Sequence, residues 1–303
     1  MFSLIIHEEV HVTMKGVMHM FIAPMLLDSK DEPFSDPAFV FEPKLDGHRI
    51  ILSVIAKETR LFTHGRQDCT KQYPELLQVP LQDDVVLDGE VCCMNPDTGS
   101  MDYELVMERL RLTQKTKIRS YASQRPVHVA VWDILYYKGR DLRNLPLVKR
   151  RSILESLLVP NDRFRLVPQV ENNGEELFRT AVEQSLEGIV AKRKDSLYVS
   201  RSSHDWISVL NRRYTEVELA GYCKHEFGWL LQTKVDGVMR PAGMLKQQVS
   251  PKQERILLSK SKKKIWFESD RFVYLKPGIK ANVMYRGFTR HGMLREPALV
   301  NIM

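Results

Sequence analysis

Long apolar runs and paired cysteines are both missing from this chain of 303 residues. No apolar run approaches the ~20 residues that a membrane-spanning helix needs, so we expect no membrane partner. The cysteines, which form neither a C-x-x-C pair nor a disulfide framework, are Cys69, Cys92, Cys93 and Cys223. This pattern fits a reducing, cytoplasmic setting. The length of 303 residues predicts one large or two moderate domains, and internal repeats and low-complexity tracts are absent.

The excess of positive charge lies in the last third of the chain. Residues 214–303 hold 16 Lys and Arg against 8 Asp and Glu, whereas residues 1–213 hold 29 against 30. A basic part of this kind is expected where a protein binds the phosphate backbone of nucleic acid. A solvated basic surface without a partner would have the same composition, so charge alone leaves both readings open.

The first nineteen residues show no clear helix or strand period. We therefore expect a leader that is detached from the fold, with translation starting at Met20. His7-Glu8-Glu9-Val10-His11 matches the zinc-protease pattern H-E-x-x-H. Such a site needs a helix held in a cleft and a third ligand, which an isolated leader does not offer. The segment also lacks the basic start and apolar core of a signal peptide.

Hydrophobic periodicity predicts a mixture of strands and helices as far as about residue 213. Strands are expected within residues 39–61 and at 85–87, 127–136 and 189–192. Helices are expected at 73–77, 103–112, 147–158 and 175–184. The helix over 147–158 is predicted to be basic on its outer face. The helix over 175–184 should bury Leu177, Phe178, Ala181 and Val182.

After residue 213 the pattern changes to alternating strands. These are predicted at residues 217–222, 229–235, 244–249, 265–267, 272–275 and 281–285. A single helix interrupts them, with Ser250 as its N-cap, Pro251 as its first residue and Gln253 completing a capping box. Strands with one internal helix suit a small closed barrel of the OB type, a common nucleic-acid platform. The expected fold class is therefore α+β.

Four short segments contain the candidate catalytic and binding residues. They are Lys44-Leu45-Asp46-Gly47-His48-Arg49, Leu87-Asp88-Gly89-Glu90, Val131-Trp132-Asp133-Ile134-Leu135 and Glu187-Gly188-Ile189-Val190-Ala191-Lys192. A lysine before Asp-Gly and a strand places an amine at a tight turn, where glycine can adopt angles closed to other residues. In this order the set resembles the nucleotidyltransferase signature of ATP-dependent DNA ligases and their relatives, the RNA ligases and mRNA capping enzymes. The resemblance covers most of residues 20–213.

The resemblance implies a fold and a reaction. A nucleotidyltransferase domain, with ATP-grasp-like antiparallel sheets and helices, would occupy residues 20–213, and an OB barrel residues 214–303. Lys44 would attack the α-phosphate of ATP and expel pyrophosphate. AMP would then pass to the 5′-phosphate of a nick in duplex DNA, and the 3′-hydroxyl would displace it. ATP and Mg²⁺ (or Mn²⁺) are the implied cofactors, nicked duplex DNA is the implied partner, and we expect a monomer.

The same resemblance assigns roles around Lys44. Glu90 and Glu187 would hold the metal ion, and Glu90 would also contact the ribose or water around it. Trp132 would stack on adenine, although a core position on a buried strand is the rival reading. Lys192 would face the α-phosphate. The remaining candidates for binding the cofactor are Glu42, Arg49, Arg66 and Arg213.

The segment after Lys192 favours a DNA ligase over a capping enzyme. Its matches to the family pattern S-x-Y-x-x-x-R-S followed by tryptophan are Ser196, Tyr198, Arg201, Ser202 and Trp206. The chain departs from the pattern where two lysines are usual, since Ser208 and Leu210 stand there, and we expect Arg212 or Arg213 to replace the charge.

Two further stretches correspond to other motifs of the family, namely the loop after Phe62 and the C-terminal basic stretch around Leu294-Arg295-Glu296-Pro297. His64 stands where the family has an arginine, with Arg66 two residues later, and Arg290 and Arg295 are candidates for the triphosphate tail. The alternatives are an RNA ligase, a GTP-using capping-type enzyme, or a degenerate nucleic-acid-binding protein without catalysis.

Overall fold

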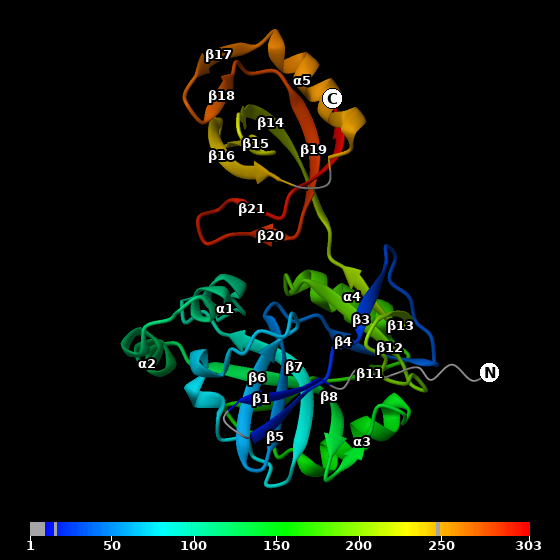
Figure 1. Ribbon diagram of the computed structural model, residues 1–303. Coiled ribbons are helices and arrows are strands. Elements are labelled where there is room, and N and C mark those ends of the chain that lie inside the picture. The colour runs from blue at the N-terminus through cyan, green and yellow to red at the C-terminus, as the bar shows by residue number, and fades with distance from the viewer. Residues whose placement is uncertain (1–9, 15–16, 98, 247–248) are drawn as a thin grey trace, which may run out of the picture. The chain divides into compact units, whose positions relative to one another are not determined.

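The structure is a computed structural model that describes residues 10–14, 17–97, 99–246 and 249–303. The chain divides into two compact units, Met1–Leu210 and Asn211–Met303 (Figure 1). The division falls three residues before the boundary expected from the sequence, and the first strand of the second unit begins at Arg213. Across the part that the structure describes, no helix is both long and apolar enough to cross a membrane.

The first unit contains a six-stranded sheet in the order β10-β8-β7-β5-β6, with β9 paired to β8. Its strands are β5 (His48–Ile55), β6 (Glu58–Thr63), β7 (Val85–Cys93), β8 (Val127–Tyr137), β9 (Arg140–Asp141) and β10 (Phe164–Leu166). All neighbours are antiparallel except β10 and β8. The main core cluster lies against this sheet and includes Ile50, Leu52, Leu87 and Val129. Helices α1 (Tyr103–Leu110), α2 (Lys115–Gln124) and α3 (Leu147–Leu157) belong to the same unit.

A second sheet of the first unit has five strands in the order β11-β4-β12-β13-β3. They are β3 (Leu26–Lys30), β4 (Phe39–Pro43), β11 (Val170–Glu171), β12 (Gly188–Arg193) and β13 (Ser202–Leu210). Helix α4 (Gly174–Glu183) packs on β4 and β12 through an apolar cluster that includes Phe41 and Ala181. β13 and β3 are parallel, so each of the two sheets departs from the expected antiparallel pairing at one pair.

Most predicted elements of this unit are confirmed, with four corrections. Residues 70–76 form two short 3₁₀ turns, η1 (Thr70–Gln72) and η2 (Pro74–Leu76), and α2 was not predicted. The outer face predicted for α3 is wrong in part, because Arg150 and Arg151 are buried. Val182 of α4 is exposed rather than packed inward.

The predicted leader without secondary structure is also wrong in part. β1 (Val10–Met14) and β2 (Val17–Phe21) form an antiparallel hairpin, and β2 lies beside β5. Backbone pairing can hold such a strand whatever the period of its side chains. Residues 7–9 of the H-E-x-x-H motif lie outside the described residues.

The second unit is built on β14 (Arg213–Cys223), a long strand that pairs with three others. The remaining strands are β15 (Trp229–Val235), β16 (Val238–Leu245), β17 (Ile265–Glu268), β18 (Phe272–Leu275), β19 (Lys280–Tyr285), β20 (Gly287–Phe288), β21 (Leu294–Arg295) and β22 (Ala298–Ile302). They enclose a core that includes Val217, Trp229, Val273 and Val283.

Helix α5 (Pro251–Lys262) is the single helix of this unit, within the residues described, as predicted. Its capping box is confirmed. The Ser250 hydroxyl accepts from the backbone N–H of Gln253, and the side-chain oxygen of Gln253 accepts from the backbone N–H of Ser250. The strand predicted at residues 244–249 is misplaced, since β16 starts at Val238 and ends at Leu245, and residues 247–248 of the prediction lie outside the described residues. The expected pattern of strands with one internal helix otherwise holds.

Candidate active site

A pocket of about 220 Å³ opens between the two sheets of the first unit. It is lined by three cationic side chains, two carboxylates, two indole rings and several apolar groups, contributed by Leu27, Glu42, Pro43, Lys44, Leu45, Arg49, Glu90, Trp132, Val190, Lys192 and Trp206. Strands β4, β12 and β13 supply residues from one sheet, and β5, β7 and β8 supply residues from the other. Six of the candidates named from the sequence line this pocket, namely Glu42, Lys44, Arg49, Glu90, Trp132 and Lys192, and Glu187 bonds to Lys44.

Lys44 follows directly after β4. Its backbone N–H donates to the Gly188 carbonyl oxygen at 2.9 Å, which ties the turn to the start of β12. The Lys44 ammonium lies 2.6 Å from a carboxylate oxygen of Glu187, a residue separated from it by 143 positions. Glu187 is buried, while 23% of the lysine side chain is exposed. The amine therefore faces the pocket with one carboxylate already in contact.

Gly47 is required by this turn for a reason that the sequence reading missed. Its φ is not positive. A Cβ at this position would lie 2.3 Å from the Val91 carbonyl oxygen and 2.7 Å from the Glu90 side chain. Glycine is therefore needed because β7 passes very close to the turn, not because the turn needs a left-handed residue.

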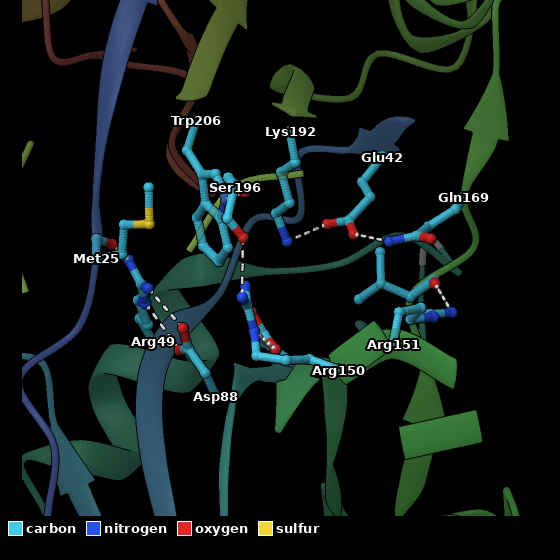
Figure 2. Close-up of polar contacts among 12 residues, drawn as sticks. Met25, Glu42, Arg49, Asp88, Arg150, Arg151, Gln169, Lys192, Ser196 and Trp206 are labelled. Atoms are coloured by element: carbon cyan, nitrogen blue, oxygen red, sulfur yellow. Dashed lines mark hydrogen bonds and ion pairs between the residues drawn. The ribbon is translucent and has the colours of Figure 1, made fainter. Parts of the chain in front are cut away.

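Arg49 is held by a buried network instead of pointing freely into the pocket (Figure 2). Its guanidinium makes two contacts with the Asp88 carboxylate, at 3.0 and 2.6 Å, and donates to the Met25 carbonyl oxygen at 2.6 Å. The Tyr198 hydroxyl donates to the same carboxylate at 2.8 Å. Asp88 raises the pKa of Arg49 against the opposing effect of burial, so the arginine stays charged.

Lys192 forms a second buried ion pair. Its ammonium lies 2.6 Å from the Glu42 carboxylate, and Gln169 donates to the other oxygen of that carboxylate at 2.8 Å (Figure 2). The same ammonium lies 4.3 Å from the ring centre of Trp206 and 5.0 Å from that of Trp132. Burial lowers the pKa of Lys192, and Glu42 opposes the shift. The side chain of Glu42 thus positions a lysine, a role that the sequence did not suggest.

Trp132 stands on β8 with its ring on the pocket wall. It is only partly buried and packs against two apolar clusters of the unit. Its indole N–H is buried and has no hydrogen-bond partner among the described residues. The position combines features of a core residue and of a ring available to a ligand, so both readings of Trp132 are supported.

Glu90 is the carboxylate of the pocket whose protonation is most perturbed. Burial raises the pKa of Glu90 to about 8, while Lys44 and Arg49 act in the opposite direction and Glu187 adds to the rise. At neutral pH this carboxylate is therefore mostly protonated, and nearby cationic charge would ionise it. Within the described residues, no group of three or more His, Cys, Asp or Glu forms a ready metal site.

Four candidates are not among the residues that line this pocket. Arg66 is exposed on the loop after β6, with its guanidinium 5.9 Å from the ring of Phe21, and it is not part of the pocket wall. Arg213 starts β14 in the second unit, where it pairs with Tyr285. Arg290 and Arg295 also belong to that unit. Their proposed contacts with the cofactor stay predictions.

Several residues that shape the pocket were not assigned roles from the sequence. Asp88 and Trp206 lie inside quoted motifs, so the signal was present but was read only as family likeness. Trp206 lies opposite Lys192 in the pairing of β12 and β13, and its indole N–H donates to the Ser196 hydroxyl at 3.3 Å (Figure 2). Gln169 had no signal, because it stands in no motif.

Ser208 and Leu210 stand where the resemblance predicts lysines. Ser208 is buried and its hydroxyl donates to the Asp28 carbonyl oxygen at 3.0 Å. It lies opposite Val190, a pocket residue. It also stands two positions after Trp206 on β13, so the two side chains lie on the same face of the strand. The position thus shares a face with the pocket, but a neutral, internally bonded side chain fills it.

Comparison with known proteins identifies the family. The family model described as the ATP-dependent DNA ligase domain matches residues 24–209, more than half of the chain. The chain belongs to the ATP-dependent DNA ligase family. This match supports the ligase prediction over the RNA-ligase, capping-enzyme and non-catalytic alternatives.

Individual relatives agree with this assignment. The SPbeta prophage-derived DNA ligase-like protein LigB of Bacillus subtilis is 36% identical over 280 residues, which cover 92% of this chain and 98% of that protein. The DNA ligase of Thermoplasma volcanium is 30% identical over 188 residues, which are 59% of this chain but only 32% of that longer protein. A solved structure of a Lig E DNA ligase covers 93% of this chain and all of its own, with a TM-score of 0.64 and 16% identity. That structural match confirms the expected fold of a nucleotidyltransferase domain with an OB-fold domain.

Proposed function

We propose that this ligase seals nicks in duplex DNA through a covalent Lys44–AMP intermediate. The supporting observation is the placement of Lys44 at the rim of a pocket that also holds Arg49, Lys192 and Trp132. One partly exposed amine, two fixed cations and a partly exposed ring suit a nucleotide with a flat base and a charged tail. ATP fits this set of groups as the source of AMP.

The first step forms a bond between the lysine nitrogen and the α-phosphorus of ATP and breaks the bond to pyrophosphate. Attack requires the neutral amine. Glu187 contacts the amine at 2.6 Å, so it must either accept the proton or release the amine before attack. Lys192 and Arg49 are held in place by Glu42 and Asp88, so they can neutralise phosphate charge without first ordering their side chains.

The later steps move AMP to DNA. The 5′-phosphate oxygen attacks the phosphorus bound to Lys44, and the lysine leaves and regains a proton. The 3′-hydroxyl then attacks the activated 5′-phosphate, forms the phosphodiester bond and releases AMP. Arg49 is the candidate for holding the 5′ end, and Arg66 and Arg213 are proposed to add contacts with phosphate.

A divalent cation fits the remaining carboxylates. Glu187 acts on the pKa of Glu90, so the two groups lie within electrostatic reach of each other. Two carboxylates are too few for a complete coordination sphere, but Mg²⁺ or Mn²⁺ commonly binds through one or two carboxylates plus substrate phosphates. When bound, the ion would neutralise charge on the triphosphate. We infer a monomer that works in the reducing cytoplasm, consistent with the free cysteines.

The direct test is labelling of Lys44→Ala with α-labelled ATP and Mg²⁺. This variant should form no covalent adduct, yet should still seal a nick whose 5′ end is already adenylated, because the amine acts only in the first two steps. Lys71→Ala, at an exposed lysine of the same unit, serves as the matched control and should label normally. An adduct on Lys44→Ala would show that another residue is the nucleophile.

A further inference from the structure

β17 is the edge strand of the large sheet in the second unit, and all four of its residues are exposed. Trp266 is 72% exposed and Phe267 56%. Neither belongs to the core cluster of this unit. Exposed edge strands with large apolar side chains invite association, so proteins usually cover or charge them. The two rings therefore need a functional explanation.

The rings of this edge form an ordered row. Phe267 lies opposite Tyr274 on β18, with ring centres 5.9 Å apart and planes 26° from parallel. The Tyr274 ring in turn lies 6.1 Å from that of Phe272. The pairing of β17 with β18 shifts register between Ile265 and Phe267, which leaves Trp266 without a cross-strand partner.

The charge around these rings is strongly positive. Residues 260–276 contain six Lys and Arg but only two Asp and Glu. The side chains of Lys262, Lys263 and Lys276 are exposed and have no ion pair or hydrogen bond within the described part of the chain. The Arg271 guanidinium lies 5.6 Å from the ring of Phe272. Lys262 ends α5, and the hairpin of β17 and β18 follows it directly (Figure 1).

We propose that this surface, the aromatic hairpin (β17, β18 and the last turn of α5), binds single-stranded DNA. Unpaired bases expose flat faces that stack on aromatic rings, and unpaired lysines neutralise the phosphates beside them. A continuous duplex keeps its base faces inside the stack and would leave the rings unused. The surface belongs to the second unit and does not depend on the chemistry proposed for Lys44. It would engage a single-stranded extension or flap on a DNA substrate.

Binding of a fluorescein-labelled dT oligonucleotide of about 20 residues, followed by anisotropy, tests the rings. Trp266→Ala/Phe267→Ala in the full chain should weaken binding by at least about tenfold, because stacking contributes roughly 1–3 kcal/mol per base. Phe288→Ala, at a ring of the same unit that is also 56% exposed, is the control and should bind like the parent. Thermal unfolding of each variant verifies that the fold is retained.

A salt series tests the charges independently of the rings. Lys262→Ala/Lys263→Ala should reduce the slope of log affinity against log salt by about 1.4, since each lysine–phosphate contact in single strands contributes about 0.7. Lys234→Ala/Arg240→Ala removes the same charge from the exposed β15–β16 hairpin and should leave the slope unchanged.

Three results would overturn the proposal. In the first, the ring variant binds dT as tightly as the parent. In the second, it loses equal affinity for a fully paired duplex, which would make the surface a duplex interface. In the third, the parent chain self-associates in sedimentation and Trp266→Ala abolishes the association, which would assign the edge to a second copy of the chain.

Discussion

At the level of single residues, a substitution at Trp132 distinguishes an effect on ATP binding from an effect on the chemical step. Its ring lies on the pocket wall and its indole N–H is unpaired among the described residues. Trp132→Ala should raise the KM for ATP in Lys44 labelling by about tenfold and change the maximal rate far less. The reason is that base stacking, on the order of 1–3 kcal/mol, is the same in the ground and transition states.

The measurement is the initial labelling rate as a function of ATP concentration. Trp132→Phe keeps an aromatic face and should stay close to the parent. A Trp132→Ala protein that folds but shows a reduced maximal rate at an unchanged KM would contradict a stacking role.

His128 is a second residue for which we expect a measurable effect, namely on the dependence of folding stability on pH. It is buried on β8, where burial, together with Arg165 and Arg163, lowers the pKa of His128 to about 4 from 6.5. Because the unfolded chain binds the proton more readily, stability is at its full value above pH 6.5 and falls as the pH drops toward 4. The loss is on the order of 3 kcal/mol.

His128→Gln should therefore flatten the decline of the unfolding midpoint between pH 6.5 and 4. Chemical denaturation at several pH values gives the comparison. His64→Gln, at an exposed loop position, is the control and should follow the parent curve. If the His128→Gln and parent curves run parallel, the buried histidine does not cause the acid sensitivity.

At the level of elements, one buried ion pair fastens α3 to the central sheet. Arg150 on α3 and Asp133 on β8 are both fully buried and bonded at 2.8 and 2.9 Å. The same guanidinium donates to the carbonyl oxygens of Leu145 and Ser196. Ser196 in turn accepts from Trp206 on the pocket wall. Helix α3 therefore supports the pocket without touching it.

Arg150→Met should cost roughly 3–5 kcal/mol of unfolding free energy, because it leaves the Asp133 carboxylate buried and unpaired. Urea unfolding measures the loss. Lys149→Met, at the exposed neighbour on the same helix, should have little effect. The double variant Asp133→Leu/Arg150→Met should regain much of the stability, and a double variant as unstable as the single one would argue against the ion-pair explanation.

At the level of the whole molecule, charge and chemistry are divided between the two units. Residues 1–210 hold 27 Lys and Arg against 30 Asp and Glu, whereas residues 211–303, which include Arg212 and Arg213, hold 18 against 8. A fragment ending at Leu210 should keep the ATP pocket but bind nicked duplex at least tenfold more weakly, with a shallower dependence on salt. Phosphate neutralisation supplies most non-specific affinity for DNA.

Binding of a nicked duplex across a salt series compares the fragment with the full chain. Circular dichroism and ATP binding verify that the fragment is folded. Equal affinity and an equal slope would show that the second unit is not the part that holds DNA. Reduced Lys44 labelling by the fragment would additionally point to a contribution from the second unit to the first step.

Local patterns in the sequence predicted most of the elements, but not α2 or the hairpin of β1 and β2. The strands around Lys44 and the capping box of Ser250 and Gln253 depend on neighbours within a few positions, so periodicity and residue type predict them. The resemblance of the four motifs to the ligase family indicated Glu90, Trp132 and Lys192, and all three line the pocket.

Only the tertiary structure decided which charges meet. Lys44 pairs with Glu187 across 143 positions and Arg49 with Asp88 across 39, and no local pattern encodes such partners. The same holds for Arg150, whose position on α3 predicts an exposed side chain until Asp133 is brought beside it. Burial of an ionised group is tolerated only where a partner of opposite charge is supplied by another element. Ion pairing in this protein is therefore a property of packing, whereas the elements that carry the charges follow from the local sequence.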